Sequence, residues 1–230
     1  MSPLVEPARW QPFGTGRMAP AGSLADAALL GRLQAYKRDV AGAYRSLPPG
    51  EILTSLPPGP CLASEKLDGE TWFLHREGDS ATLLSPAGKA VTGVPVTEEA
   101  AIGHWSGLIA GELYAARDNG RPRVFDLHAA IGGGALAQTD RLRFAAFDLL
   151  LDADTDAQRT PYPARVARLE KLLHGGSRLH CARCETVGAP AAATALFENI
   201  VTRASVEASS STQATAAPSR SSPRYPSMRR

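Results

Sequence analysis

The stretch EKLDG at residues 65–69 decides the fold of this chain. It follows the proline- and glycine-rich break PPGP at residues 57–60 and precedes a strand-like run at residues 71–75. A lysine, any residue, an aspartate and a glycine in this order is a weak signal alone, because a surface turn with a Lys–Asp pair has the same pattern. The features that follow it along the chain give the motif its weight.

Those features occur in a fixed order after the lysine. They are GELYA at residues 111–115, FAAFDLL at residues 144–150, RVARLEKLL at residues 165–173 and Glu207. In this order they resemble the covalent nucleotidyltransferases, and most closely the adenylation domain of the ATP-dependent DNA ligases. The resemblance covers about residues 55–207. It implies an enzyme that forms a lysyl-AMP intermediate from ATP and seals 5′-phosphate ends of DNA in repair, recombination or replication.

The resemblance also implies a role for each candidate site residue. Lys66 would be the nucleophile that carries AMP, because a free amine can attack the α-phosphate of ATP. Asp68, the second catalytic candidate, would fix the loop and contact a ribose or the end being sealed. The other candidates are the nucleotide contacts Glu65, Gly69, Glu112 and Phe147 and the Mg²⁺ ligands Glu112 and Glu207, whose carboxylate oxygens suit this cation. Phe147 would stack on adenine or, alternatively, serve as a core aromatic in a central strand.

Two departures from the ligase pattern leave the substrate polymer open. DNA ligases usually carry a glutamate two places before the nucleophile and an arginine a few places after it, whereas this chain has Ser64 and Thr71-Trp72 there. A Glu-Lys pair, as at residues 65–66, is more similar to some RNA ligases, but the segment at residues 111–127 and the arginine-bearing helix are typical of DNA ligases. We expect nicked DNA as the partner, bound weakly without a C-terminal oligonucleotide-binding domain, and RNA as the alternative.

The interleaved helix and strand patterns predict an α+β protein, and the resemblance to the ligases implies the nucleotidyltransferase fold, with two antiparallel sheets flanked by helices. An N-terminal helical segment at residues 1–55 precedes the ligase domain at residues 56–207, and its main helix is expected over residues 23–44, with Ser23 as the N-cap. Further helices are expected over residues 163–173 and 191–202. The expected strands cover residues 71–75, 81–84, 108–115, 124–128 and 142–151, with a hairpin turn at 118–120 and a short strand or turn at 51–56.

Residues 208–230 break this pattern. They contain seven serines and no Leu, Ile, Val or Phe, and this composition predicts a disordered tail. If codons are read from the third base of the Glu207 codon, TCN codons for residues 209–211 become codons for Leu, Ile, Val or Phe. Suitable synonymous codons then give GLVVHSSDGRSFKVKPEISIDAA, which contains the glycine, apolar triplet and Lys-x-Lys that the ligase pattern expects.

We interpret this tail as the product of a one-base deletion after Glu207, either a real mutation or a sequencing error. Any serine-rich tail yields apolar codons when it is shifted, but the match begins at the glutamate where the pattern breaks. The chain as written is therefore expected to be impaired as an enzyme. The alternative is an inactive, truncated fragment of a ligase.

Composition limits the remaining possibilities. The chain has 230 residues, of which 43% are hydrophobic and 21% charged, enough for one sizeable core. It has no membrane-length apolar run, no signal-peptide core in residues 1–18 and only three cysteines, so a cytoplasmic protein is expected. We also expect it to act as a monomer. The tail carries four arginines and no acid, so the other 207 residues have a net charge of −2 and no broad basic footprint. A nucleic-acid-binding arginine tail is a poor alternative, because these arginines are sparse and accompanied by one aromatic residue.

Overall fold

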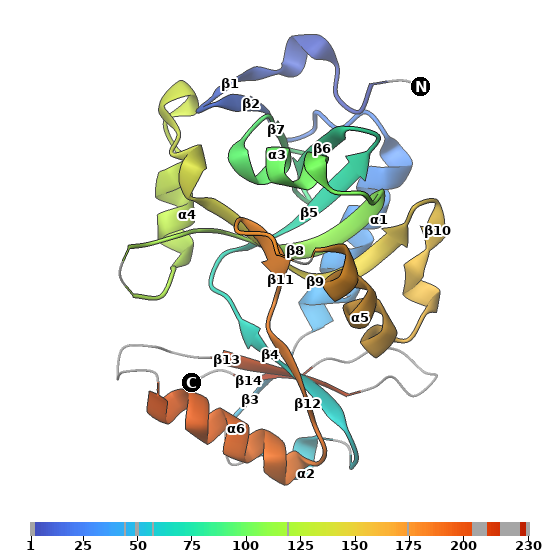
Figure 1. Ribbon diagram of the computed structural model, residues 1–230, viewed down its shortest axis with the longest axis vertical. Helices are drawn as coiled ribbons and strands as arrows, with labels where there is room; N and C mark the ends of the chain where they lie inside the picture. The colour runs from blue at the N-terminus through green and yellow to red at the C-terminus, as the bar shows by residue number, and fades with distance from the viewer. Residues whose placement is uncertain are drawn as a thin grey trace.

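The computed structural model describes residues 3–43, 45–48, 51–56, 58–118, 120–173, 175–203, 211–216 and 226–228. These residues form two sheets (Figure 1). The centre of the larger sheet consists of β5 (Glu70–Glu77), β8 (Gly107–Ala115) and β9 (Leu142–Asp152). Its outer strands are β1 (Gln11–Phe13), β2 (Gly16–Ala19), β6 (Ser80–Leu84), β7 (Ala90–Thr92), β10 (Thr155–Asp156) and β11 (Leu179–Cys181). The strand order is β1-β2-β7-β6-β5-β8-β9-β10, and neighbours are antiparallel except that β11 runs parallel to β9.

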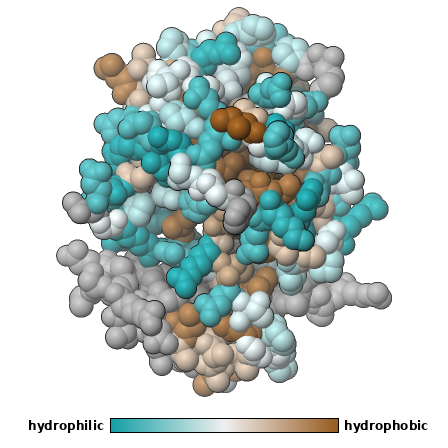
Figure 2. All heavy atoms as spheres, in the orientation of Figure 1, coloured by the Kyte–Doolittle hydropathy of each residue, from teal (hydrophilic) through white to brown (hydrophobic). Residues whose placement is uncertain are grey.

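The smaller sheet lies below the larger one in Figure 1, and β4 leads from one to the other. Its order is β12-β4-β13-β14-β3. The bounds are β3 (Arg45–Leu47), β4 (Cys61–Lys66), β12 (Cys184–Val187), β13 (Ser211–Ala216) and β14 (Pro226–Met228). Helices α6 (Pro190–Arg203) and α2 (Ile52–Ser55) lie on its outer side (Figure 1). Figure 2 shows hydrophobic residues gathered at this lower end of the molecule.

Helices cover both faces of the larger sheet. On one face, Leu33 and Tyr36 of α1 (Ala27–Asp39) pack in a buried cluster with Phe73. The other face packs against α3 (Pro95–Ile102), α4 (Val124–Ile131) and α5 (Tyr162–Leu172). Trp72 and Leu74 lie in that second cluster, as expected from side chains that alternate along a strand. The 3₁₀ turns are Pro7–Arg9, Ala41–Ala43, Gly134–Leu136, Thr139–Arg141 and Ala157–Arg159.

The α+β class is confirmed, and so are most of the expected elements. Strands occur at the positions expected from residues 71–75, 81–84, 108–115 and 142–151, and α5 and α6 match the helices expected at 163–173 and 191–202. The N-terminal segment contains the expected helix, but its N-cap is Asp26 rather than Ser23, because the Asp26 carboxylate accepts the Leu29 N–H at 2.9 Å. The same segment also supplies β1 and β2, which pairing with β7 holds in the larger sheet.

Two local predictions were wrong, at residues 124–128 and 51–56. The strand expected at residues 124–128 is helix α4. The Asp126 carboxylate accepts the Arg123 N–H at 2.8 Å at the start of this helix, and the helix buries Leu127 and Ala130 at helical spacing. The residues around the hairpin turn expected at 118–120 therefore join β8 to a helix, although Asn119 itself lies outside the described residues. The short strand or turn expected at 51–56 is the helical turn α2.

The tail expected to be disordered contains β13 and β14. Residues 211–216 run antiparallel to β4, with Ser211 opposite Lys66 and Ala216 opposite Cys61. The physical reason is that the edge of a strand presents backbone N–H and C=O groups. An extended segment can form hydrogen bonds with these groups regardless of which side chains it carries. The other residues of the tail, for which disorder was also expected, lie outside the described residues.

Candidate active site

A cleft of about 850 Å³ brings most of the predicted site residues together. This volume lies within the range of about 300–1,000 Å³ that is usual for small-molecule sites. The predicted residues that line it are Glu65, Lys66, Asp68, Gly69, Glu112 and Phe147. The remaining predicted residue, Glu207, lies outside the described residues. The cleft combines the end of β4 and the start of β5 with β8, β9 and α1, so its walls come from distant parts of the sequence.

Lys66 is the last residue of β4, at the point where the chain turns into β5. Its ammonium donates to the Leu67 carbonyl oxygen at 3.4 Å, and the guanidinium of Arg121 donates to the Lys66 carbonyl oxygen. The turn needs a glycine at residue 69, because a Cβ there would collide with the Leu113 carbonyl oxygen and lie 3.1 Å from the Tyr114 Cβ. The glycine of the motif thus allows the lysine-bearing turn to lie directly against β8.

Glu112 forms the other side of this turn. Its Oε1 accepts the Gly69 N–H at 3.0 Å, the one hydrogen bond to this carboxylate among the described residues. Burial raises the pKa of Glu112, and the charges of Lys66 and Lys37 oppose this rise only in part. The group is therefore a desolvated carboxylate close to Lys66, with acceptor capacity for a further ligand. Such a hard oxygen donor fits Mg²⁺.

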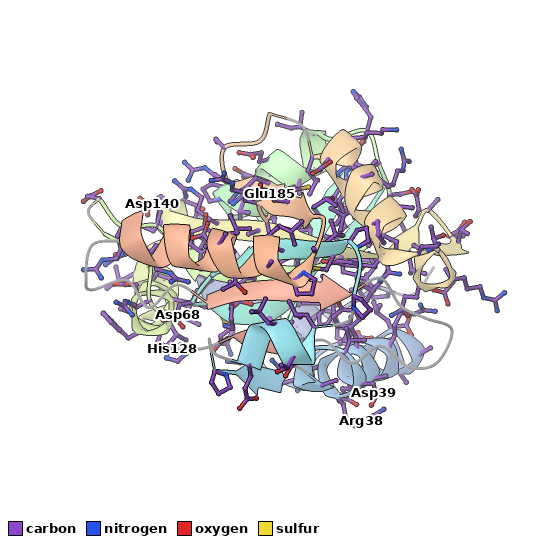
Figure 3. The ribbon with its side chains drawn as sticks, turned by 90° about the horizontal axis from the view of Figure 1, so that it is seen from below. Arg38, Asp39, Asp68, His128, Asp140 and Glu185 are labelled. Atoms are coloured by element: carbon purple, nitrogen blue, oxygen red, sulfur yellow. The ribbon has the colours of Figure 1, made fainter. Side chains whose placement is uncertain are left out.

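Asp68 lies half-buried in the turn between Lys66 and Gly69. Its negative charge contributes to the raised pKa of Glu112, after the larger effect of burial. Figure 3 shows Asp68 and His128 on the same side of the molecule. Asp68 lines the cleft together with Lys66 and Glu112, so its side chain is available to contact a ligand bound there.

Phe147 has features of both alternatives considered for it. Its half-buried side chain lines the cleft, and it also packs against the buried cluster that includes residues of α1. Its carbonyl oxygen accepts the Tyr162 hydroxyl at 2.9 Å, which ties β9 to α5 at this point. A ring in this position can offer one surface to a ligand while its other atoms remain in the core.

The next residue, Asp148, has a structural role: it joins β9 to α1 and α5 next to Phe147. Its carboxylate accepts two hydrogen bonds from Arg165 of α5, at 2.7 and 3.1 Å, and one from the Tyr36 hydroxyl of α1 at 2.9 Å. The Asp148 and Arg165 side chains are only 3% and 9% exposed. This buried ion pair joins α1, β9 and α5, so the FAAFDLL and RVARLEKLL segments meet in space.

Comparison with known proteins agrees with this geometry. The sequence profile described as the ATP dependent DNA ligase domain matches residues 43–205, which is most of the chain. The chain belongs to this family. A probable DNA ligase of Rhodococcus jostii (strain RHA1) is 30% identical over 176 residues, which are 73% of this chain and 35% of that protein. The chain thus spans about a third of the length of this curated relative.

Solved structures show the same fold. The ligase domain from M. tuberculosis LigD matches with a TM-score of 0.55 and 21% identity, over 74% of this chain and 53% of that one. The mycobacterial DNA ligase D complexed with ATP and MES matches with a TM-score of 0.52 and 20% identity, over 74% of this chain and 54% of that one. The fold is therefore that of the nucleotidyltransferase domain of ligases.

None of the helices in the described residues is long and apolar enough to cross a membrane.

The sequence reasoning missed several charged residues of this ligase-family cleft. Lys37 comes from α1 and Lys89 from the turn before β7, and both line the cleft with Lys66. Glu70 also lines it and contacts His128 Nε2 at 2.8 Å. Burial would raise the pKa of Glu70, but hydrogen bonds from His128 and Trp72 outweigh it, so this pKa is lowered. Periodicity could not reveal Lys37 and Lys89, because only the fold brings α1 and the turn before β7 to the cleft. Glu70 directly follows Gly69, and its contact with His128 of α4 depends on the fold in the same way.

Two arginines form a small cluster near the cleft: Arg143 lies on β9, the strand that also carries Phe147, and Arg178 directly precedes β11. Arg143 is the cross-strand partner of Tyr114, and both Arg143 and Arg178 donate to the Asp140 carbonyl oxygen. Burial and the nearby charge of Arg178 lower the pKa of Arg143. Neither arginine forms a salt bridge with another described residue. The sequence had indicated no broad basic footprint, and the structure shows this local one. Asp140, whose carbonyl oxygen accepts both arginines, is labelled in Figure 3 and locates this cluster.

Proposed function

We propose that this chain performs the nucleotidyl-transfer steps of an ATP-dependent DNA ligase, with Lys66 as the residue that carries AMP. The observation that carries this proposal is the position of Lys66 at the end of β4, in a cleft shared with Glu112 and two further lysines, Lys37 and Lys89. The positive charges suit a triphosphate, and the buried carboxylate suits the cation that accompanies it.

The first step joins AMP to the lysine. Lys66 loses a proton to solvent, and its Nζ forms a bond to the α-phosphorus of ATP. The bond from this phosphorus to the oxygen that bridges to the β-phosphate breaks, and pyrophosphate leaves with the second amine proton. The product is a phosphoramide on Lys66, from which AMP would pass to a 5′-phosphate end.

The other candidate residues have supporting roles in this proposal. Glu112 would hold Mg²⁺, which supplies positive charge to the phosphates, and Glu207 is proposed as a second ligand. Gly69 keeps Glu112 in place through its N–H, while Glu65 and Asp68 would contact the nucleotide or the end being sealed. Phe147 would stack on adenine with the part of its ring that faces the cleft.

The proposed partner is nicked DNA in repair, recombination or replication, and the family favours DNA over RNA. The arginine cluster of Arg143 and Arg178 supports a contact with the phosphate backbone, because neither guanidinium forms a salt bridge with a carboxylate in the described ranges. The proposed setting is the cytoplasm, with the protein acting as a monomer. All three cysteines are free, which suits a reducing compartment.

A second candidate is that the chain as written is an impaired enzyme, because residues 208–230 are the product of a one-base deletion. The backbone register supports the importance of this region, since residues 211–216 lie beside β4 with Ser211 opposite Lys66. A frame-restored chain would place an apolar triplet and two lysines after Glu207. The change would therefore affect the strand next to the nucleophile.

Label transfer tests both candidates. The 230-residue chain and a frame-restored form are incubated with α-labelled ATP and Mg²⁺, and protein-bound label is counted after acid precipitation. The frame-restored form should be labelled, and Lys66→Arg should abolish the label because a guanidinium stays protonated. Lys171→Arg on the exposed surface of α5 is the matched control and should change nothing. Strong labelling of the 230-residue form, with no gain on restoring the frame, would contradict the deletion.

A further inference from the structure

Helix α1 lies before the segment that matches the ligase family, yet it reaches the candidate active site. The family match begins at residue 43, whereas α1 covers Ala27–Asp39. Its last turn is fixed by Tyr36, whose hydroxyl donates to the Asp148 carboxylate at 2.9 Å and whose ring packs edge-on against Phe73 at 5.7 Å. Because Tyr36 is anchored in this way, the next residue, Lys37, has a defined position at the cleft.

The ammonium of Lys37 is held next to the Glu112 carboxylate. Its Nζ donates to the Thr71 hydroxyl at 3.3 Å, and Thr71 is the cross-strand partner of Glu112. Side chains of such a pair lie about 5 Å apart at their Cβ atoms, so the contact with Thr71 places the Lys37 ammonium near Glu112. The charge of Lys37 accordingly opposes the rise in the pKa of Glu112.

Lys37 retains capacity to bind an anion. Within the described ranges it forms no salt bridge, whereas its neighbour Arg38 is paired with Asp39 at 2.7 Å. An ammonium has three N–H donors, and Thr71 accepts one of them. Figure 3 shows Arg38 and Asp39 together at the edge of the molecule. Two successive basic residues of one helix therefore differ: one is neutralised at the surface, and the other lines the cleft.

Thr71 accepts the Lys37 ammonium but carries no charge of its own, so Lys37 brings the positive charge to this part of β5. We propose that Lys37 supplies this charge from α1 and binds the phosphates of ATP. This inference rests on the proposed function, because it takes ATP as the ligand of the cleft. It makes the N-terminal helix part of the nucleotide site, so the adenylation unit of this chain begins before residue 43.

The test compares ATP and adenosine as ligands of the full 230-residue chain by titration calorimetry. Lys37→Met keeps the length and helix propensity of the side chain but removes its charge. It should raise the dissociation constant of ATP by about tenfold to a hundredfold, the usual effect of losing a charged hydrogen bond, and leave that of adenosine unchanged. Lys37→Arg should restore most of the ATP affinity. Arg38→Met is the matched control and should bind both ligands as the unchanged chain does.

Two results would overturn the inference. Equal ATP affinity in Lys37→Met and the unchanged chain would show that Lys37 does not contact the phosphates. An equal loss for ATP and adenosine would show that Lys37 only shapes the cleft. Either result leaves the proposed function standing, since that depends on whether Lys66→Arg abolishes label transfer. Thermal unfolding of each variant checks that the fold is retained.

Discussion

The buried Asp148–Arg165 ion pair allows a quantitative test of how the family's sequence segments build the cleft. Asp148→Asn keeps the shape of the side chain but removes the charge that faces Arg165. The two side chains are 3% and 9% exposed, so the guanidinium would remain buried without this carboxylate. Breaking a buried pair from one side costs about 3–5 kcal/mol of unfolding free energy. For a chain of this size that corresponds to a fall in Tm of roughly 6–20 °C.

The same strand and helix provide a matched control for this variant. Asp152 and Arg168 also join β9 to α5 at 2.7 Å, but their side chains are 35% and 47% exposed. Asp152→Asn should therefore cost at most about 1 kcal/mol, because an exposed ion pair contributes little. Thermal unfolding followed by circular dichroism measures both variants. Adding Arg165→Met to Asp148→Asn should recover part of the lost unfolding free energy, because the buried guanidinium without a partner is then removed. If Asp148→Asn and Asp152→Asn lower Tm equally, the assignment of Asp148 as the anchor of the cleft is wrong.

Three further predictions follow from the site. Gly69→Ala should cost about 1–3 kcal/mol of stability and displace the N–H that holds Glu112, so label transfer should fall in parallel with Tm, whereas an unchanged Tm would contradict the close approach to Leu113. Glu112→Gln should abolish label transfer yet raise stability at neutral pH. The pKa of Glu112 is raised in the native state, so the native state binds this proton more tightly than the unfolded state does. The unchanged chain therefore loses stability as the pH rises from the ordinary carboxyl pKa through the raised value, whereas the Gln variant does not. A pH titration of Tm should show this gain shrinking below that window, and a constant difference would contradict it. The double variant Arg143→Ala, Arg178→Ala should reduce the salt dependence of nicked-DNA binding by about two in the slope of log K against log salt, and an unchanged slope would show that the arginine cluster does not contact the backbone.

Much of the site could be predicted because its motifs depend on local chemistry. The Lys-x-Asp-Gly turn and the glutamate of the GELYA strand contact each other directly, through the Gly69 N–H and the Glu112 carboxylate. The order of these features along the chain therefore indicated a common cleft, and the structure brings Lys66, Glu112 and Phe147 to one. What these residues do chemically remains a prediction that the label-transfer experiment tests.

The missed parts depend on contacts that lie far apart in the sequence. The VFDLH run at residues 124–128 fits both a strand and a helix over so few residues, and the N-terminal contact from Asp126 together with packing against β8 favours the helix. Lys37 lies within the helix expected over residues 23–44, and nothing in the helical pattern distinguishes it from other polar residues of that helix. Only the anchoring of Tyr36 to Asp148 shows that this helix ends at the cleft.

Peptide mapping of the adenylylated protein by mass spectrometry tests the central claim most directly. The frame-restored chain is incubated with ATP and Mg²⁺, digested with protease, and the peptide that carries AMP is sequenced by fragmentation. The account predicts a single adduct on Lys66 and none on Lys37 or Lys89, although all three lysines line the cleft. An adduct on either of the other two lysines, with Lys66 unmodified, would contradict the account.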